Sequence, residues 1–302
     1  MWKTVLLLLA TLIAVPVFAY LYDTPPNLEQ LRVLWPVVYT YIGLSAACFI
    51  VSSIVDNYSQ VDKLWSVAPL IYAWEVAYLS HWDERMILIA SVISIWGIRL
   101  TYNFGRRGGY SWKFWTGDED YRWAVLRAKP EFQAPWKWIS FNFFFISFYQ
   151  MGLVMLIMFP MIKGVNGTEL FWADYLLALL VVGFVIMEYF ADHQQYKFQT
   201  EKHRRIDANE ELGEYEHGFV NTGLWSIIRH PNYAAEQSVW IVIYFFSVTA
   251  TGVWINWSVA GAILLVLLFI GSSNFSEEIS ASKYPKYKEY QKKVARFIPF
   301  LK

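Results

Sequence analysis

The chain contains the stretch Gly-Leu-Trp-Ser-Ile-Ile-Arg-His-Pro-Asn-Tyr-Ala-Ala-Glu at residues 223–236, between a charged segment and an apolar run. Gly223 permits a positive φ, and Pro231 fits the first turn of a helix, where no backbone N–H is needed. We therefore predict a helix that begins at Pro231. It carries Asn232 and Glu236, which are four residues apart and share one face, into the next apolar segment.

Two interpretations of this stretch are open. Arg229 and His230 precede the helix start, where backbone N–H groups, the helix dipole and a guanidinium would together bind a phosphate. Alternatively, the stretch is a membrane-interface turn in which Arg229 reaches the headgroups and Trp225 and Tyr233 are interfacial aromatics. A carboxylate and an amide just inside an apolar helix are costly in lipid, so they favour a functional site.

The composition is that of a membrane protein. Of 302 residues, 56% are hydrophobic and 19% are aromatic, which exceeds the roughly half apolar content of soluble domains. The 25 basic and 25 acidic residues balance, so no nucleic-acid partner is expected. The single cysteine, Cys48, excludes an internal disulfide and a multi-cysteine metal site, and we expect no metal.

The hydropathy pattern predicts an all-α integral membrane bundle of about seven or eight transmembrane helices in one domain, 1–302. Each crossing needs about twenty apolar residues, and an open sheet edge cannot lie in lipid. The first apolar segment could be a cleaved signal peptide or a retained transmembrane helix, and we favour the retained helix. The expected spans are 2–21, 33–55, 64–80, 86–104, 136–162, 170–190, 239–251 and 253–272.

Positive charge predicts the orientation of the bundle. Lysine and arginine gather in the loop 105–135, in the polar segment 191–222 and in the C-terminal tail. Eight spans put these three regions on one side, which the positive-inside rule makes cytoplasmic. We expect a bacterial inner membrane or endoplasmic reticulum protein with a cytoplasmic C-terminus.

Polar residues near the predicted cytoplasmic ends are candidates for a site. Glu188, Asp192 and Gln195 are four and then three residues apart, which places them on one helix face. Arg99 lies inside the span 86–104, where a guanidinium needs a partner or a bound anion. The loop 105–135 adds further candidates that suit a phosphate, including Arg107, Asp120 and Arg122.

Several short motifs, taken in order, resemble the membrane steroid 5-alpha-reductase superfamily, in its largely unassigned branch. They are residues 61–66 (Val-Asp-Lys-Leu-Trp-Ser), 96–100 (Trp-Gly-Ile-Arg-Leu), 119–122, 191–195, 223–233 and the tail 287–299. The resemblance covers residue 56 to the C-terminus, beyond the N-terminal helices of 1–55. It implies that the C-terminal half binds NADPH from the cytoplasmic side.

The resemblance also implies roles for individual residues. An acid and a tyrosine of the N-terminal half polarise the substrate's carbonyl in that superfamily. Asp62 is our candidate for the acid, and Tyr102 replaces the family tyrosine, whose place is taken by Trp96. The candidate cofactor ligands are Arg99, Arg107, Asp120, Arg122, Glu188, Asp192, Gln195, Arg229, His230, Asn232, Tyr233, Glu236, Glu278 and Tyr287.

The expected activity is NADPH-dependent reduction of an activated C=C bond in an apolar lipid or steroid-like enone that enters from the bilayer. The isoprenylcysteine carboxyl methyltransferases share Arg-His-Pro-x-Tyr and a Glu-Glu plus Tyr-x-x-Tyr tail, so an S-adenosylmethionine-dependent methyltransferase is the alternative. A transporter or lipid-binding scaffold is the non-enzymatic interpretation, with Glu75 and Asn142 as its only indications. Membrane lipid is the expected partner, and no protein partner is inferred.

Overall fold

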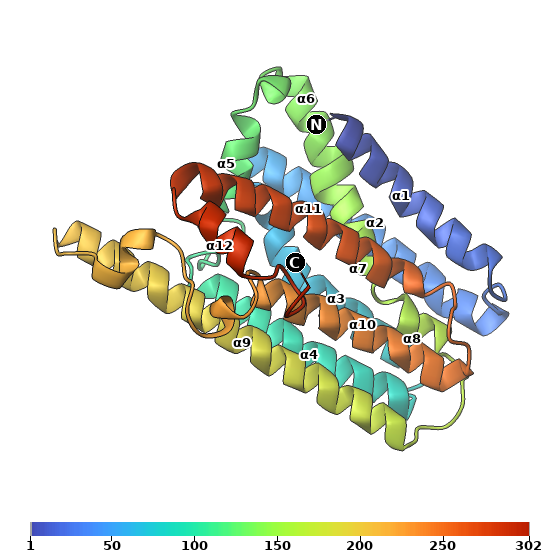
Figure 1. Cartoon of the computed structure of the whole chain (residues 1–302). Coiled ribbons are helices and arrows are strands. Elements are labelled where there is room, and N and C mark those ends of the chain that lie inside the picture. Colours follow the sequence, from blue (N-terminus) through green and yellow to red (C-terminus); the bar gives the residue numbers. More distant parts are fainter. Residues whose placement is uncertain (1, 302) are drawn as a thin grey trace. The chain divides into compact units, whose positions relative to one another are not determined.

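The computed structural model describes residues 2–301, and within them the regular structure is helical, with no strand (Figure 1). The predicted all-α class is confirmed. The chain divides into two compact units. Unit 1 comprises the described residues through Leu179 together with Ile241–Leu265, and unit 2 comprises Leu180–Trp240 and the described residues from Val266 onward.

Five helical stretches of the described chain are long and apolar enough to cross a membrane, which supports an integral membrane protein. The other three predicted spans are also helical, at α1 (Trp2–Leu21), α3 (Gln60–Leu79) and α10 (Pro231–Thr251). The predicted helix positions are thus confirmed, whereas the count of seven or eight crossings is not. The five stretches are α2 (Leu28–Val55), α4 (Glu84–Gly105), Pro135–Lys163, α9 (Trp172–Asp207) and α11 (Val259–Lys283).

Short polar sequences begin the helices of unit 1. Asn27 caps α2 through a capping box, in which its side chain accepts from Gln30 N and Gln30 Oε1 accepts from Asn27 N. Asp83 accepts from the first backbone N–H groups of α4, and Asp120 does the same for α5 (Tyr121–Arg127). These caps are local, so the sequence alone places these helix starts.

The packing of unit 1 centres on α3, which packs most extensively on α4 and next on α2. The predicted span 136–162 is four consecutive helices: α6 (Pro135–Phe141), the π-helix η2 (Asn142–Tyr149), α7 (Gln150–Leu156) and α8 (Phe159–Lys163). Asn142, at the start of η2, donates from Nδ2 to Ser52 Oγ at 3.0 Å and Ser53 Oγ at 3.1 Å on α2. This buried amide satisfies its donors inside an otherwise apolar layer.

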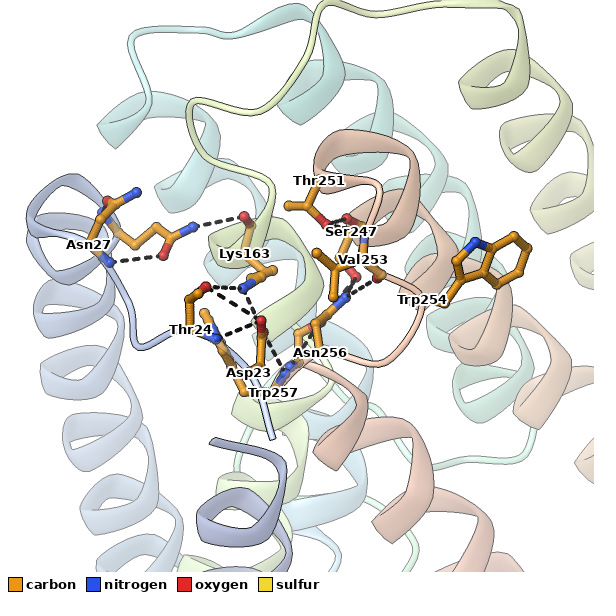
Figure 2. Close-up of polar contacts among 12 residues, drawn as sticks. Asp23, Thr24, Asn27, Lys163, Ser247, Thr251, Val253, Trp254, Asn256 and Trp257 are labelled. Carbon is orange, nitrogen blue, oxygen red and sulfur yellow. Dashed lines mark hydrogen bonds and ion pairs between the residues drawn. The ribbon is translucent and has the colours of Figure 1, made fainter. Parts of the chain in front are cut away.

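A buried ion pair ties four segments of unit 1 together, as Figure 2 shows. Lys163 Nζ, at the end of α8, lies 2.6 Å from Asp23 Oδ2, and their side chains are only 5% and 3% exposed. Asp23 also accepts from the backbone N–H groups of Thr24 at 2.7 Å and Trp257 at 3.1 Å. Gln30 Nε2 donates to the carbonyl of Lys163 at 2.8 Å, which adds the start of α2.

A second buried pair in unit 1 joins α4 to α9. Arg85 Nε and Nη2 donate to the two carboxylate oxygens of Asp174 at 2.9 and 3.0 Å. Thr249 Oγ1 donates to Asp174 at 2.6 Å, and Arg85 also donates to the carbonyls of Thr168 and Glu169. The two charges compensate each other, and both side chains make further hydrogen bonds, as an ion pair removed from water requires.

The structure corrects the bounds of two predicted spans. The span 170–190 is part of a longer helix, because α9 continues to Asp207 (Figure 1), and the short helices η3 (Gly213–His217) and η4 (Gly223–Ser226) follow it. The last predicted span does not begin at 253, because α11 starts at Val259. Asn256 holds the preceding turn, donating to Ser247 Oγ at 3.0 Å and to the carbonyl of Val253 at 3.1 Å (Figure 2).

Candidate functional site

The stretch 223–236 lies in unit 2 and has the predicted local structure. Gly223 adopts φ +59°, η4 follows it, and α10 begins at Pro231. Leu224 N donates to Gln194 Oε1 at 3.0 Å, and a Cβ built on Gly223 would approach the Gln194 side chain to 2.7 Å. Glycine is therefore required both by its backbone angle and by the closeness of α9.

Arg229 connects this stretch to the C-terminal part of unit 2. Its Nε donates to Glu277 Oε1 at 2.7 Å and its Nη2 to Oε2 at 3.4 Å, with both side chains buried. Its Nη1 donates to the carbonyls of Gln291, at 3.0 Å, and Val294. Most of the guanidinium's five N–H donors are thus used within the protein, so Arg229 positions α11 and the segment after α12 (Tyr287–Lys293).

His230 is held by the same carboxylate. Its Nε2 lies 2.9 Å from Glu277 Oε1, and its ring stacks on Tyr233, with centroids 5.2 Å apart and an interplanar angle of 17°. Burial lowers the pKa of His230 below its ordinary value, although Glu277 acts to raise it. The ring is therefore neutral at pH 7 and donates from Nε2 to Glu277.

The backbone of the C-terminal segment runs beside the Arg229 stretch. Arg229 N donates to the carbonyl of Ala295 at 2.8 Å, and His230 N donates to that of Arg296 at 3.2 Å. Tyr290 on α12 donates its hydroxyl to the carbonyl of Trp225. Tyr287, a predicted site residue, is buried beside Tyr290 and against Phe219.

A second polar group joins α9 to the start of α10. Asn232 Nδ2 donates to Asp192 Oδ1 at 3.1 Å, and Asp192 is buried. Glu188 and Glu236 are also buried, and Glu236 accepts from Trp240 Nε1 at 2.9 Å. The predicted α9 face of Glu188, Asp192 and Gln195 therefore lies within unit 2 and meets α10 at Asn232.

Gln195 completes this group with an unsatisfied acceptor. Its Oε1 is buried and, within the described part of the chain, has no hydrogen-bond partner. A buried amide oxygen without a partner costs roughly 1–3 kcal/mol. The site can therefore accept an N–H or O–H donor from a ligand, beside the carboxylate and amide of Asp192 and Asn232.

Unit 1 carries a separate group of predicted site residues at the start of α3. Asp62 Oδ2 accepts from Trp123 Nε1 at 3.0 Å. Asp120 forms a two-point ion pair with Arg122, whose Nε and Nη2 lie 2.8 and 3.0 Å from its oxygens, and Asp120 N donates to Ser59 Oγ at 2.9 Å. Two carboxylates, Asp62 and Asp120, therefore lie near the start of α3: Asp62 accepts from a tryptophan, and Asp120 is paired with an arginine.

The surroundings of these two carboxylates shift their pKa values in opposite directions. Burial raises the pKa of Asp62, which precedes the apolar part of α3. Burial also acts to raise the pKa of Asp120, but the Arg122 guanidinium outweighs it and holds that pKa below its ordinary value. Of the two carboxyls, Asp62 thus binds a proton more readily than an ordinary aspartate, and Asp120 binds one less readily.

Comparison with known proteins assigns the family. The family model described as "Protein of unknown function (DUF1295)" matches residues 48–294. The chain belongs to the DUF1295 family. An uncharacterized protein of Schizosaccharomyces pombe is 32% identical over 266 residues, which covers 83% of this chain and 75% of that protein. No solved structure matches the chain.

The remaining predicted site residues of this DUF1295 protein lie apart from the two groups or at its surface. Arg99 is buried on α4 in unit 1. Tyr102 is 55% exposed, and the Arg106 guanidinium lies 5.5 Å from its ring centroid. Arg107 and Glu278 are exposed. The roles predicted for these residues stay predictions.

Glu277 was not predicted from the sequence as a site residue of the DUF1295 chain. Glu277 accepts from Arg229, His230 and Gln291, whereas its neighbour Glu278, which was predicted, is exposed. The sequence offered two adjacent carboxylates at this place, and only the packing of α11 shows that Glu277 is the buried one. Trp123, the partner of Asp62, was also missed, and no local pattern indicates that contact.

Proposed function

We propose that this DUF1295 protein is a membrane-embedded, NADPH-dependent reductase of an activated C=C bond in an apolar lipid or steroid-like enone. The observation that carries the proposal is the buried Gln195 Oε1, which has no hydrogen-bond partner among the described residues and lies about one turn of α9 from Asp192, the partner of Asn232. A polar group with an unused acceptor inside an apolar helix pair favours a ligand with N–H or O–H donors. The motif resemblance to the steroid 5-alpha-reductase superfamily supports the same cofactor.

The donor and acceptor set fits the nicotinamide-ribose end of NADPH. Asp192, Gln195 and Glu236 offer oxygens to the carboxamide N–H₂ and the ribose hydroxyls, and Asn232 fixes Asp192. Because Arg229 is paired with Glu277, we propose Arg229 and His230 as supports for the Asn232 helix start and not as phosphate ligands. NADPH, when bound, supplies a hydride to the substrate.

Asp62 is the proposed proton donor of unit 1. Hydride addition to an enone develops negative charge on the carbonyl oxygen, which requires a donor directed at that oxygen. Burial raises the pKa of the Asp62 carboxyl, which favours its protonated form, and a protonated carboxyl is such a donor. Trp123 Nε1, 3.0 Å from Oδ2, would fix the orientation of the carboxyl. The exposed Tyr102 is the weaker candidate for this role.

The alternative function is an S-adenosylmethionine-dependent methyltransferase. The observation that favours it is the excess of buried carboxylates in unit 2, because Glu188, Asp192 and Glu236 suit a cationic ligand better than a phosphate. The Arg229–Glu277 pair also belongs to the motifs that resemble the isoprenylcysteine carboxyl methyltransferases. The two proposals use the same acceptors and differ in the cofactor.

The deciding experiment measures cofactor binding to the purified protein in detergent. A ligand that binds only the folded state raises the unfolding temperature, by an amount that grows with the ratio of its concentration to its Kd. We expect a shift with NADPH and none with S-adenosylmethionine, and the reverse result would establish the methyltransferase alternative. No shift with either ligand would remove both functions.

Variants of the α9–α10 group test the site. Asn232→Ala and Gln195→Leu should each weaken NADPH binding about 5- to 150-fold, which corresponds to the roughly 1–3 kcal/mol of one hydrogen bond to a buried partner. Gln133→Ala is the matched control, because Gln133 is an exposed amide of unit 1. Oxidation of NADPH with a panel of enone lipids, on the parent and Asp62→Asn, then tests the reaction. Unchanged turnover in Asp62→Asn would exclude Asp62 as the donor.

A further inference from the structure

The loop after α4 presents aromatic side chains to its surroundings. α4 ends at Gly105, and the loop contains Trp112, Phe114 and Trp115 at its tip. Trp112 is 105% exposed, Phe114 67% and Trp115 40%. Three large aromatic side chains within four residues form an apolar surface of a kind that usually contacts a partner or a membrane.

Side chains of α3 fix the backbone of this loop. Lys63 Nζ donates to the carbonyls of Phe114 at 2.9 Å and Thr116 at 2.7 Å. Gln60 Nε2 donates to the carbonyl of Trp115 at 2.9 Å. Lys63 is a buried residue whose ammonium takes loop carbonyls as partners, so the loop cannot leave α3 without leaving a buried charge unsatisfied.

These contacts also set the depth of the tip relative to the bilayer. Gln60 and Lys63 lie in the first turn of α3, and the predicted apolar part of α3 begins at residue 64. The candidate membrane span α4 ends at Gly105, directly before the loop. The loop backbone is therefore held where the helices leave the hydrocarbon, which is the depth at which tryptophan is enriched in membrane proteins.

The part of the loop that carries the tip is basic, and acidic residues directly follow it. Residues 105–117 contain Arg106, Arg107 and Lys113, and Asp118, Glu119 and Asp120 come next, of which Asp120 is paired with Arg122. A basic residue near a membrane surface is attracted to anionic lipids. Aromatic side chains beside basic ones are the composition of an interfacial membrane contact.

We propose that residues 112–115 insert into the headgroup region of the anionic phospholipid bilayer that surrounds this protein. The loop acts as an interfacial anchor, fixed to α3 by Lys63 and Gln60. The occupant of this surface is phospholipid: the ring faces lie among the headgroups and the basic side chains meet lipid phosphates. The proposal rests on the membrane-spanning helices and is independent of the proposed reaction.

The test places a fluorophore at the tip. Trp112→Cys in a Cys48→Ala background, labelled with an environment-sensitive dye, is reconstituted in nanodiscs that contain headgroup-spin-labelled lipid. The control is Asn209→Cys in the same background, because Asn209 is also exposed but lies beyond the end of α9. We expect lipid quenching at position 112 to be at least threefold stronger than at 209. Equal quenching at the two positions would overturn the proposal.

Two further arms distinguish anionic lipid from neutral lipid and from cofactor as the group that the loop contacts. Replacing phosphatidylglycerol by phosphatidylcholine should reduce the quenching at least twofold, since the loop charges lose their anionic partners; equal quenching would overturn the anionic specificity. NADPH should leave the quenching unchanged, and its loss on adding NADPH would show that the loop contacts cofactor and not lipid. Lys113→Gln, at an exposed position, should lower the quenching in anionic discs only.

Discussion

The Asp23–Lys163 pair makes a quantitative prediction about the stability of unit 1 (Figure 2). Asp23→Asn keeps the side-chain shape and one acceptor oxygen, but it leaves the buried Lys163 ammonium without a counter-charge. Removing one partner of a buried ion pair costs roughly 3–5 kcal/mol. Lys163→Met should cost less, about 1.5–3 kcal/mol for one lost charged hydrogen bond, because Asp23 keeps two backbone donors.

The double variant and a control make the prediction specific. The double variant Asp23→Asn, Lys163→Met should lower the free energy of unfolding by less than the sum of the single changes, with a difference of roughly 0.5–3 kcal/mol, the range found for residues in direct contact. Arg32→Met is the matched control, because the Arg32–Glu29 pair on α2 is exposed and should contribute less than about 1 kcal/mol. Reversible unfolding in mixed micelles provides the free energies.

The pH dependence of this pair follows from the direction of the Asp23 pKa shift. Burial acts to raise the pKa of Asp23, but hydrogen bonds from Lys163 and from the backbone of Trp257 and Thr24 outweigh it and hold the pKa below its ordinary value. The stabilisation is therefore present above the unfolded pKa, about 3.9, and is lost as pH falls below it. The difference between parent and Asp23→Asn should be constant from pH 7 to pH 5 and shrink below pH 4. Additive single changes, or a cost below 1 kcal/mol for Asp23→Asn, would refute the reasoning.

Three further variants test contacts in both units. Gly223→Ala should lower the free energy of unfolding by roughly 1–3 kcal/mol, because a φ of +59° is strained for alanine and the added Cβ would meet the Gln194 side chain. Adding Gln194→Ala should restore part of the lost stability, measured by chemical unfolding. Glu277→Gln should lower the free energy of unfolding by roughly 3–5 kcal/mol, because the buried Arg229 then loses its counter-charge. An unchanged unfolding midpoint would show that the Arg229–Glu277 pair does not stabilise unit 2. Arg85→Lys should cost about 1.5–3 kcal/mol in the same assay, since lysine cannot reproduce the two-point contact, whereas an equal stability would show that charge alone suffices.

The candidate site was predictable where its signals are local. The proline at 231 starts α10, and the glycine at 223 adopts the positive φ expected of it. The spacing of Glu188, Asp192 and Gln195 predicted one helix face, and α9 has that face. The partners of these residues were not predictable from spacing, because Asn232 is forty positions from Asp192 and only packing brings them together.

Arg229 shows how tertiary structure changes the interpretation of a correct motif. The sequence places an arginine before a helix start, which suits a phosphate. The structure gives that guanidinium a buried carboxylate, Glu277, and two backbone carbonyls from a segment more than sixty residues away. A local pattern identifies a functional group but cannot show whether another part of the chain already binds it.

The sequence by itself determined the all-α class, the positions of the eight helical segments and the residues that begin several of them, because hydrophobic periodicity and capping act over a few residues. Only the tertiary structure decided which charges are buried and paired. Asp23 with Lys163 and Arg85 with Asp174 join residues 140 and 89 positions apart. Such pairs depend on the three-dimensional approach of whole helices, since an ionised side chain enters a low-dielectric interior only when its partner arrives with it.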